Sequence, residues 1–157
     1  MNQNAASFFI DRHKESAYAS KKAFVEFSDK SRSISYLQLA QKSSKIIDFF
    51  RKHQIYQEDR VAMLMLDIIE FPIIFWGSLK SGVVPIPINT LLSVEVIQSI
   101  LIDSRAKAIF ISKELLESVI EILETNKFLK KIFVVGDPSD KYINFNTEID
   151  KCIEFST

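Results

Sequence analysis

Two carboxylates three positions apart, Asp67 and Glu70, are the residues whose types and spacing come nearest to a catalytic pair. They follow an apolar run, and a carboxylate at the carboxyl end of a buried strand can serve acid–base or metal chemistry. The same spacing also suits a helix start, where an aspartate accepts backbone N–H groups and a glutamate three residues later reaches back. We interpret the two residues as a helix-capping box.

Other candidates for nucleophilic or metal chemistry are isolated along the chain. His13 and His53 stand on polar helical stretches without a cysteine or carboxylate at ligand spacing, so we expect both to be solvated. Cys152 is the single cysteine, which excludes an internal disulfide and, with two histidines, a zinc site of ordinary ligand count. We expect an inert thiol in a reducing compartment.

Phe71, Phe75 and Trp76 recur at helical spacing. Such a stripe is typical of a buried core, and the alternative is an aromatic lining for a ligand pocket. We predict core positions for all three.

Glycine is scarce, with Gly77, Gly82 and Gly136 the only examples. Their spacing fits neither the phosphate loop G-x-x-x-x-G-K-[ST] nor the dinucleotide motif G-x-G-x-x-G. A nucleophile elbow G-x-S-x-G is also absent from the sequence. We therefore expect no phosphate cradle in these 157 residues.

The elements that would position these residues begin with a peripheral part. Residues 4–20 predict a loosely amphipathic helix, and residues 22–27 and 33–36 predict a small antiparallel hairpin. Ser35 with Gln38 forms a capping box, which predicts a helix from there to about His53.

Four continuous apolar runs follow at regular intervals, at 61–66, 83–88, 108–111 and 132–135. Short runs without alternation, joined by segments long enough for a helix, indicate a parallel sheet that is covered on both faces. The first joining segment predicts a helix through Lys80, with Pro72 in its first turn and Gly82 at its end. The second predicts a helix capped by Ser93 that runs to about Asp103, and the third a helix from Lys113 to Thr125 capped by Ser112. The fold class is therefore α/β, a Rossmann-like right-handed β-α-β-α-β-α-β layer preceded by a hairpin.

Pro85 and Pro87 are awkward in this scheme, because each removes a ladder donor, and they predict a short or distorted strand. Residues 137–157 form a polar tail with one helical turn near 147–152. We expect one α/β domain over 1–157, of which this tail leads toward a missing remainder.

The charges are balanced, with 20 Lys+Arg against 20 Asp+Glu, and no basic run exceeds two residues. Nucleic acid is therefore an unlikely class of partner. Residues 61–88 are apolar but interrupted by Asp67, Glu70 and Lys80, which excludes a membrane span there. The first residues lack a basic n-region, so we expect a soluble, cytoplasmic protein without a secretory signal.

Residues 63–112 contain specific sequence motifs that composition alone does not reveal. They contain D-x-x-E-F-P at 67–72, F-W-G-S-L-K-S-G-V-V-P-I-P-I-N-T-L-L at 75–92 and D-S-R-A-K at 103–107. This stretch closely resembles the N-terminal part of the adenylate-forming acyl-CoA synthetases, and among them the benzoate-CoA ligase group. The flanking sequences NAASFFIDRH, SISYLQLAQ and EDRVAMLML are similar to that group in the same order.

The resemblance implies a parent enzyme that uses ATP, Mg²⁺ and coenzyme A to activate an aryl acid. The family's Ser/Thr/Gly-rich phosphate loop, nucleotide motifs, acyl pocket and catalytic lysine lie beyond the matching region and have no counterpart here. Some relatives carry a basic residue for the coenzyme A phosphate where this chain has Thr90, Leu91 and Leu92, so that role is not carried over. Lys80 and Arg105 are nearby cations, but we assign neither as a ligand. The expected catalytic, cofactor-binding and metal-binding residues in this chain are therefore none.

We accordingly expect an N-terminal fragment of a benzoate-like CoA ligase, inactive alone, whose partner is the remainder of its own enzyme. Truncation would leave a large apolar patch or an unpaired sheet edge, through which copies of the chain could self-associate. Two alternatives stay open: a stand-alone interaction module, and a ligand-binding domain that uses the Phe71, Phe75 and Trp76 cluster.

Overall fold

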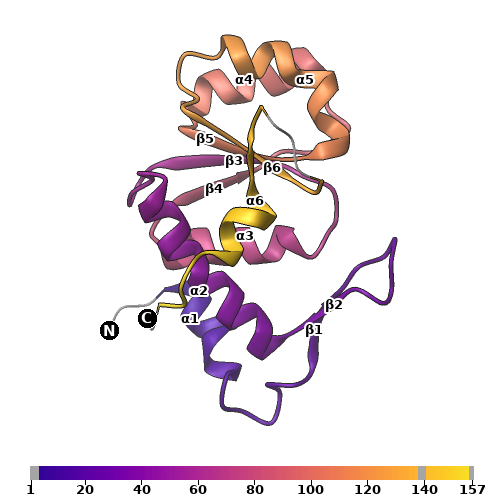
Figure 1. The fold of residues 1–157 in the computed structure, drawn as a ribbon, viewed down its shortest axis with the longest axis vertical. Coiled ribbons are helices and arrows are strands. Elements are labelled where there is room, and N and C mark those ends of the chain that lie inside the picture. Colours follow the sequence, from indigo (N-terminus) through magenta and orange to yellow (C-terminus); the bar gives the residue numbers. More distant parts are fainter. Residues whose placement is uncertain (1–3, 138–140, 156–157) are drawn as a thin grey trace. The chain divides into compact units, whose positions relative to one another are not determined.

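The computed structural model describes residues 4–137 and 141–155, which fall into two compact units (Figure 1). Unit 1 is formed by Met1–Gln57, Asp67–Val83 and Cys152–Thr157. Unit 2 is formed by Glu58–Leu66 and Val84–Lys151. Each unit is therefore assembled from segments that are distant in the sequence.

Unit 2 contains a five-stranded sheet in which every neighbouring pair is parallel. Its strands, in the spatial order β4-β3-β5-β6-β7, are Val84–Pro87, Arg60–Leu64, Ala108–Ser112, Lys131–Val135 and Ile143–Asn144. The four apolar runs are thus confirmed as β3, β4, β5 and β6, the first four strands of this sheet in chain order. The fifth, β7, was not predicted, because two residues are too few to show a strand pattern.

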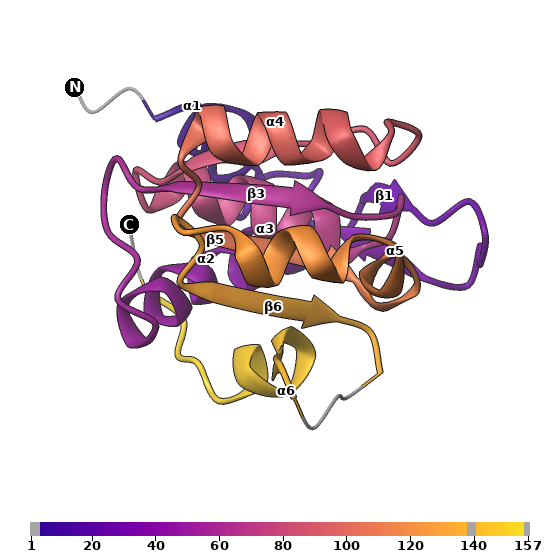
Figure 2. The same ribbon diagram turned by 90° about the horizontal axis from the view of Figure 1, so that it is seen from above.

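Helices cover both faces of this sheet within unit 2. The helices are α4 at Val94–Ser104, α5 at Lys113–Thr125 and α6 at Phe145–Asp150. Figure 2 shows α4 and α5 side by side along the strands, and their apolar residues share one core with strand residues. That core includes Leu64, Ile97, Leu101, Ile109, Ile111, Leu116, Val119 and Val134. On the opposite face, Phe145 of α6 meets Phe110 edge-on, with ring centroids 5.6 Å apart.

The two prolines of β4 fit the sheet because this strand lies at its edge. Val84 N–H donates to Asp59 O at 2.9 Å and Ile88 N–H to Met63 O at 2.9 Å, so the even-numbered donors face β3. Successive residues of a strand direct their N–H groups to opposite sides, which turns Pro85 and Pro87 to the outer side. The prolines therefore remove no bond to β3 and make the outer side a poor template for another strand.

Unit 1 is built from short N-terminal elements and two packed helices. They are α1 at Ala5–Phe9, the 3₁₀ turn η1 at Asp11–His13, β1 at Lys22–Val25, β2 at Ser33–Ser35, α2 at Tyr36–Lys52 and α3 at Glu70–Lys80. The hairpin is confirmed, and so is the capping box, in which Gln38 N–H donates to Ser35 Oγ. The single helix over 4–20 is wrong. Buried Ile10 is the C-cap that ends α1, and it is followed by η1, whose Asp11 pairs with Lys80.

The close contact of α2 and α3 depends on Gly77. A Cβ at this position would lie 2.4 Å from Ile46 Cβ, so only glycine allows the two helix backbones to approach this closely. At the end of α3, Gly82 has φ +69°, which confirms the predicted glycine stop. Pro72 lies in the first turn of α3, as predicted, where its missing donor costs little.

The C-terminal stretch contains more structure than the one helical turn predicted for it. It supplies β7 and α6 to unit 2, and Ile153 N–H then donates to Asp48 Oδ2 of unit 1 at 3.1 Å. Residues 138–140 and 156–157 of the predicted tail lie outside the described residues. Among the described helices, none has the length and apolar character that crossing a membrane requires.

Candidate functional site

The carboxyl ends of parallel strands are the usual ligand positions of such a sheet. In unit 2, polar side chains at these ends accept hydrogen bonds from nearby backbone N–H groups. Ser112 Oγ accepts from Leu66 N–H at 3.0 Å, and Asn89 Oδ1 accepts from Leu91 N–H at 2.9 Å. Because its hydroxyl bonds to Leu66, Ser112 does not cap α5 with its side chain, which corrects that prediction. Ser93 likewise precedes α4 without a side-chain capping bond. The side-chain oxygens of Ser112 and Asn89 are thus engaged in hydrogen bonds to the backbone.

Asp67 and Glu70 do not form the predicted capping box. The N-cap of α3 is Ile69, with no side-chain capping bond of its own. Its N–H donates instead to Glu26 Oε2, at 3.3 Å, from the hairpin. Asp67 is exposed, whereas the Glu70 side chain is 13% exposed and pairs with Arg32 at 2.8 Å. The helix start is therefore served by a residue 43 positions away, which local spacing cannot reveal.

Arg32 joins Glu70 to Glu26 in an ionic cluster. Its guanidinium lies 2.8 Å from each carboxylate, and the Glu26 side chain is only 5% exposed. Burial lowers the pKa of Arg32, but the charges and hydrogen bonds of Glu70 and Glu26 outweigh it and leave the pKa above its usual value. The permanently charged guanidinium thus holds both carboxylates as acceptors, a structural rather than a catalytic arrangement.

The two histidines are not solvated as predicted but half-buried among aromatic rings. The His13 ring centroid lies 4.8 Å from that of Tyr36, and the His53 ring 4.6 Å from Phe49. Cys152 is buried, and Lys52 Nζ lies 3.9 Å from its sulfur. This basic neighbour comes from α2, 100 residues earlier, so the sequence spacing could not indicate it.

Of the two cations singled out, Lys80 is an internal anchor of unit 1. Its side chain is 1% exposed, and Nζ donates to Asp11 Oδ1 at 2.6 Å, Ala40 O at 2.9 Å and Ser44 Oγ at 3.0 Å. Burial lowers the pKa of Lys80, and Asp11 opposes that shift. Arg105 is exposed and ends α4 in the left-handed region. Neither residue is placed as a ligand-binding group.

The aromatic cluster is not core. Phe71, Phe75 and Trp76 are each half-buried, which corrects the prediction. Phe71 helps to line a cavity of about 320 Å³ together with Phe24, Phe27 and Asp67, all within unit 1. The open rings therefore form part of a surface.

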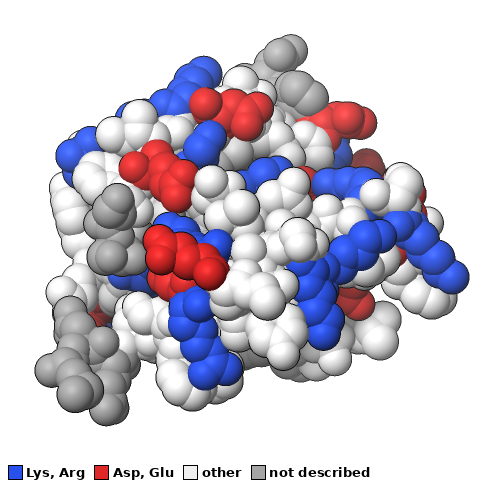
Figure 3. Space-filling view, turned by 90° about the horizontal axis from the view of Figure 1, so that it is seen from below, with Lys and Arg blue, Asp and Glu red and all other residues white. Residues whose placement is uncertain are grey.

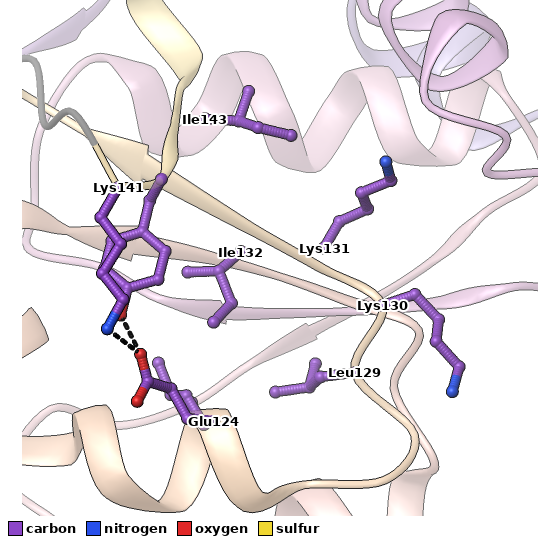
Figure 4. Close-up of a pocket in the computed structure, with 9 residues that line it drawn as sticks. Glu124, Leu129, Lys130, Lys131, Ile132, Lys141 and Ile143 are labelled. Atoms are coloured by element: carbon purple, nitrogen blue, oxygen red, sulfur yellow. Dashed lines mark hydrogen bonds and ion pairs between the residues drawn. The ribbon is translucent and has the colours of Figure 1, made fainter.

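A second cavity, of about 350 Å³, lies in unit 2 between the end of α5 and the beginnings of β6 and β7 (Figure 4). Glu124 in this cavity accepts from Lys141 Nζ, 2.5 Å away, and from the Tyr142 hydroxyl. The bond from Lys141 is the main reason why the pKa of Glu124 lies below its usual range. Figure 4 shows the Lys130 and Lys131 ammonium groups pointing away from Glu124 and from each other, so they do not converge on an anion.

The described residues contain no group of three or more His, Cys, Asp or Glu side chains that could hold a metal ion. On the face in Figure 3, positive and negative groups are interspersed with uncharged surface rather than gathered into one basic field.

Comparison with known proteins supplies what the geometry lacks. Residues 12–152 match the family model described as AMP-binding enzyme. The chain is 34% identical over 134 residues to the 4-hydroxybenzoate-CoA/benzoate-CoA ligase of Rhodopseudomonas palustris, which covers 85% of this chain and 24% of that protein. It is also 34% identical over 134 residues to the benzoate-CoA ligase of Thauera aromatica, with 85% and 25% covered.

Solved structures agree with these relatives. The fold matches an anthranilate CoA ligase in complex with anthranoyl-AMP, with a TM-score of 0.86, 26% identity, and coverage of 96% of this chain and 28% of that one. A benzoate CoA ligase from Burkholderia xenovorans matches with a TM-score of 0.82, 26% identity, and 96% and 29% covered. The chain thus spans about a quarter of the length of its curated relatives. The resemblance inferred from the sequence is confirmed: the chain belongs to the AMP-binding enzyme family, and its sequence and fold are similar to those of the benzoate-CoA ligases.

Proposed function

We propose that these 157 residues form the N-terminal α/β part of an ATP-dependent CoA ligase for an aromatic acid such as benzoate. One observation carries the proposal: 85% of the chain aligns at 34% identity with a benzoate-CoA ligase. The fold supports it, because the structural matches to aryl-CoA ligases cover 96% of the chain.

The proposed reaction has two steps. A carboxylate oxygen attacks the α-phosphate of ATP, which forms an acyl-adenylate and releases pyrophosphate. The thiol sulfur of coenzyme A then attacks the acyl carbon, and AMP leaves with the electron pair of the broken C–O bond. Adenylation is needed because a carboxylate oxygen is a poor leaving group, whereas AMP is a stable one.

The described residues do not fit ATP·Mg²⁺ by themselves. They offer no cluster of metal-ligating side chains, and the three glycines of the sequence form no phosphate loop. Thr90, Leu91 and Leu92 also supply no cation for a phosphate of coenzyme A. We therefore assign no chemical step to residues of this chain and propose that it is inactive alone, acting as a rigid scaffold for the rest of its enzyme. A cytoplasmic location is part of this proposal, because the reaction uses ATP and coenzyme A.

A segment exchange tests this function. The 134-residue matching segment of the Rhodopseudomonas palustris ligase is replaced by the aligned residues of this chain. The chimera should form benzoyl-CoA and AMP from benzoate, ATP and coenzyme A. The parent ligase is the positive control, and the chimera assayed without benzoate is the negative control.

Two results would contradict the proposal. One is a chimera that unfolds cooperatively, and is therefore folded, but forms no thioester. The other is thioester or adenylate formation by residues 1–157 alone.

A further inference from the structure

We propose that unit 1 presents an aromatic surface onto which the remaining polypeptide of the ligase packs. The aromatic surface consists of Phe8, Phe9, Phe24, Phe27, Phe71, Phe75 and Trp76. This inference rests on the proposed function and names the surface through which this part of the enzyme would contact the rest.

The rings of this surface are linked in an unbroken series. Phe9 meets Trp76 at a centroid distance of 6.1 Å, Trp76 meets Phe75 at 5.4 Å, and Phe75 meets Phe71 at 6.4 Å. Phe8 extends the series beyond Phe9, at 5.0 Å. At the other end, Phe71 shares the 320 Å³ cavity with Phe24 and Phe27. The apolar area is therefore contiguous across α1, α3 and the hairpin.

These side chains are too exposed to be explained by the core of unit 1. The exposed fractions are 58% for Phe8, 53% for Phe9, 42% for Phe24 and 88% for Phe27. Scattered exposed apolar residues are ordinary, but contiguous apolar patches mark interaction sites, and aromatic residues are enriched in the buried centres of interfaces.

The hairpin gives a second reason to expect a covering partner. It has only two strands, β1 and β2, and β1 exposes Phe24 on one face and Val25 on the other. A two-stranded hairpin is marginal in water unless it packs against something else. Its exposed apolar residues therefore need a surface to pack on.

Several charges of unit 1 near this surface are held in ion pairs, whereas Asp67 is exposed in the cavity and Arg12 lies over the Phe8 ring at 4.2 Å. Arg32 holds Glu26 and Glu70, and Lys80 holds Asp11. A strongly acidic or basic partner would thus find no unpaired anchor in these clusters, and an apolar protein surface is the chemistry that fits.

The lengths of the relatives identify the occupant. The aligned ligases are about four times as long as the part that this chain matches, since it covers 24% and 25% of them. The remaining polypeptide needs an apolar face to pack against, and the aromatic surface is a contiguous apolar face of unit 1.

Trp76 is the single tryptophan and reports on this surface directly. The isolated chain and the chimera described above are labelled with 5-fluorotryptophan, and the Trp76 ¹⁹F signal is assigned by its disappearance in Trp76→Phe. The signal should shift between H₂O and D₂O in the isolated chain, because Trp76 is half-buried, and should lose this solvent shift in the chimera.

Paired variants test the same surface without fluorine. Phe24→Ala with Phe27→Ala should leave the Tm of the isolated chain unchanged but lower the benzoyl-CoA activity of the chimera by about tenfold or more. Ile102→Ala, at a 50% exposed position on α4 of unit 2, is the control and should change neither the Tm nor the activity.

The outcomes separate this inference from the proposed function. An active chimera in which Trp76 keeps its solvent shift, and in which the double alanine change has no effect, overturns the docking surface alone. A folded chimera that protects Trp76 but forms no thioester contradicts the function alone. If the isolated chain dimerises on sedimentation and Trp76 is protected in that dimer, a second copy is the occupant and the inference is wrong.

Discussion

At the scale of single residues, Lys80 is a cation held almost entirely out of water. Its three acceptors come from η1 and α2, and the other Asp11 oxygen, Oδ2, is buried with no hydrogen-bond partner. Removing the ammonium group therefore strands a carboxylate in a poorly solvated position. Charged groups of this kind are costly to leave uncompensated.

Lys80→Met should accordingly destabilise the chain by about 3 kcal/mol, because the Asp11 carboxylate loses its ion pair with Lys80 while the apolar stem is retained. Urea unfolding measures the change in the free energy of unfolding. The double variant Lys80→Met with Asp11→Leu should recover much of this loss, because it removes both charges. Equal stability of the single and double variants would show that the ion pair is not the cause.

Asp48 is the residue whose protonation should make the stability of unit 1 depend on pH. Its side chain is 1% exposed; burial raises its pKa, and hydrogen bonds from Lys52, Ile153 N–H and Arg51 outweigh that effect, so the pKa lies below its ordinary value. A carboxylate with a lowered native pKa binds fewer protons folded than unfolded. Its stabilisation is therefore complete above its unfolded pKa of about 4 and is lost as the pH falls through the native pKa.

Asp48→Asn should cost about 2 kcal/mol at pH 7, because the charged acceptor of these bonds is lost. Below pH 4 the difference between the variant and the unchanged protein should shrink. Thermal unfolding from pH 7 to pH 2.5 follows it, and Gln41→Ala, at an exposed position of the same helix, provides a baseline. Parallel loss of stability in both proteins would refute the role of this carboxylate.

At the scale of elements, the contact of α2 with α3 is set by one missing side chain. A methyl group at Gly77 would overlap Ile46 Cβ and Cγ1, each at 2.4 Å, and these atoms cannot move without the helix backbone. Alanine is favoured over glycine by about 1 kcal/mol in a helix interior, but overpacking costs up to about 3 kcal/mol.

Gly77→Ala should therefore destabilise the chain by about 2 kcal/mol net, despite its better helix propensity. Ser118→Ala on the exposed side of α5 is the matched control and should change stability by less than about 0.5 kcal/mol. Denaturant unfolding of both variants checks the prediction. A Gly77→Ala variant as stable as the unchanged chain would mean that the two helices can separate at little cost.

The elements of unit 2 were predictable because their signals are local. Continuous apolar runs identified β3 to β6, and the apolar stripe of residues 113–125 identified α5 with the bounds that the structure has. The 4–20 helix failed, because the buried pairing of Asp11 with Lys80, 69 residues away, takes precedence over helix continuation. Long-range partners were equally invisible at Glu26 and at Cys152.

The candidate site was predictable only in part, for the same reason. Types and spacing gave Arg105, Thr90 and Leu91 no ligand role, and that assignment stays a prediction. They could not show that Ser112 bonds to Leu66, or that Phe71, Phe75 and Trp76 remain half-exposed. Exposure depends on what covers a helix, and helical spacing alone does not contain that information.

At the scale of the whole molecule, the chain combines two compact units whose described residues are occupied with structural contacts. Some of the charged side chains that could in principle take part in catalysis, such as Glu26, Arg32 and Lys80, are held in ion pairs. The residues that match the AMP-binding family model, 12–152, thus form an α/β scaffold. We expect the nucleotide chemistry to require polypeptide beyond these residues.

The most direct test of this account is benzoate-dependent exchange of labelled pyrophosphate into ATP by the purified 157-residue chain. The account predicts exchange at the level of a no-protein blank, at millimolar Mg²⁺ and with the chain shown to be folded by cooperative unfolding. Exchange above that blank, dependent on both benzoate and this chain, would mean that these residues bind ATP and make the adenylate themselves, and would contradict it.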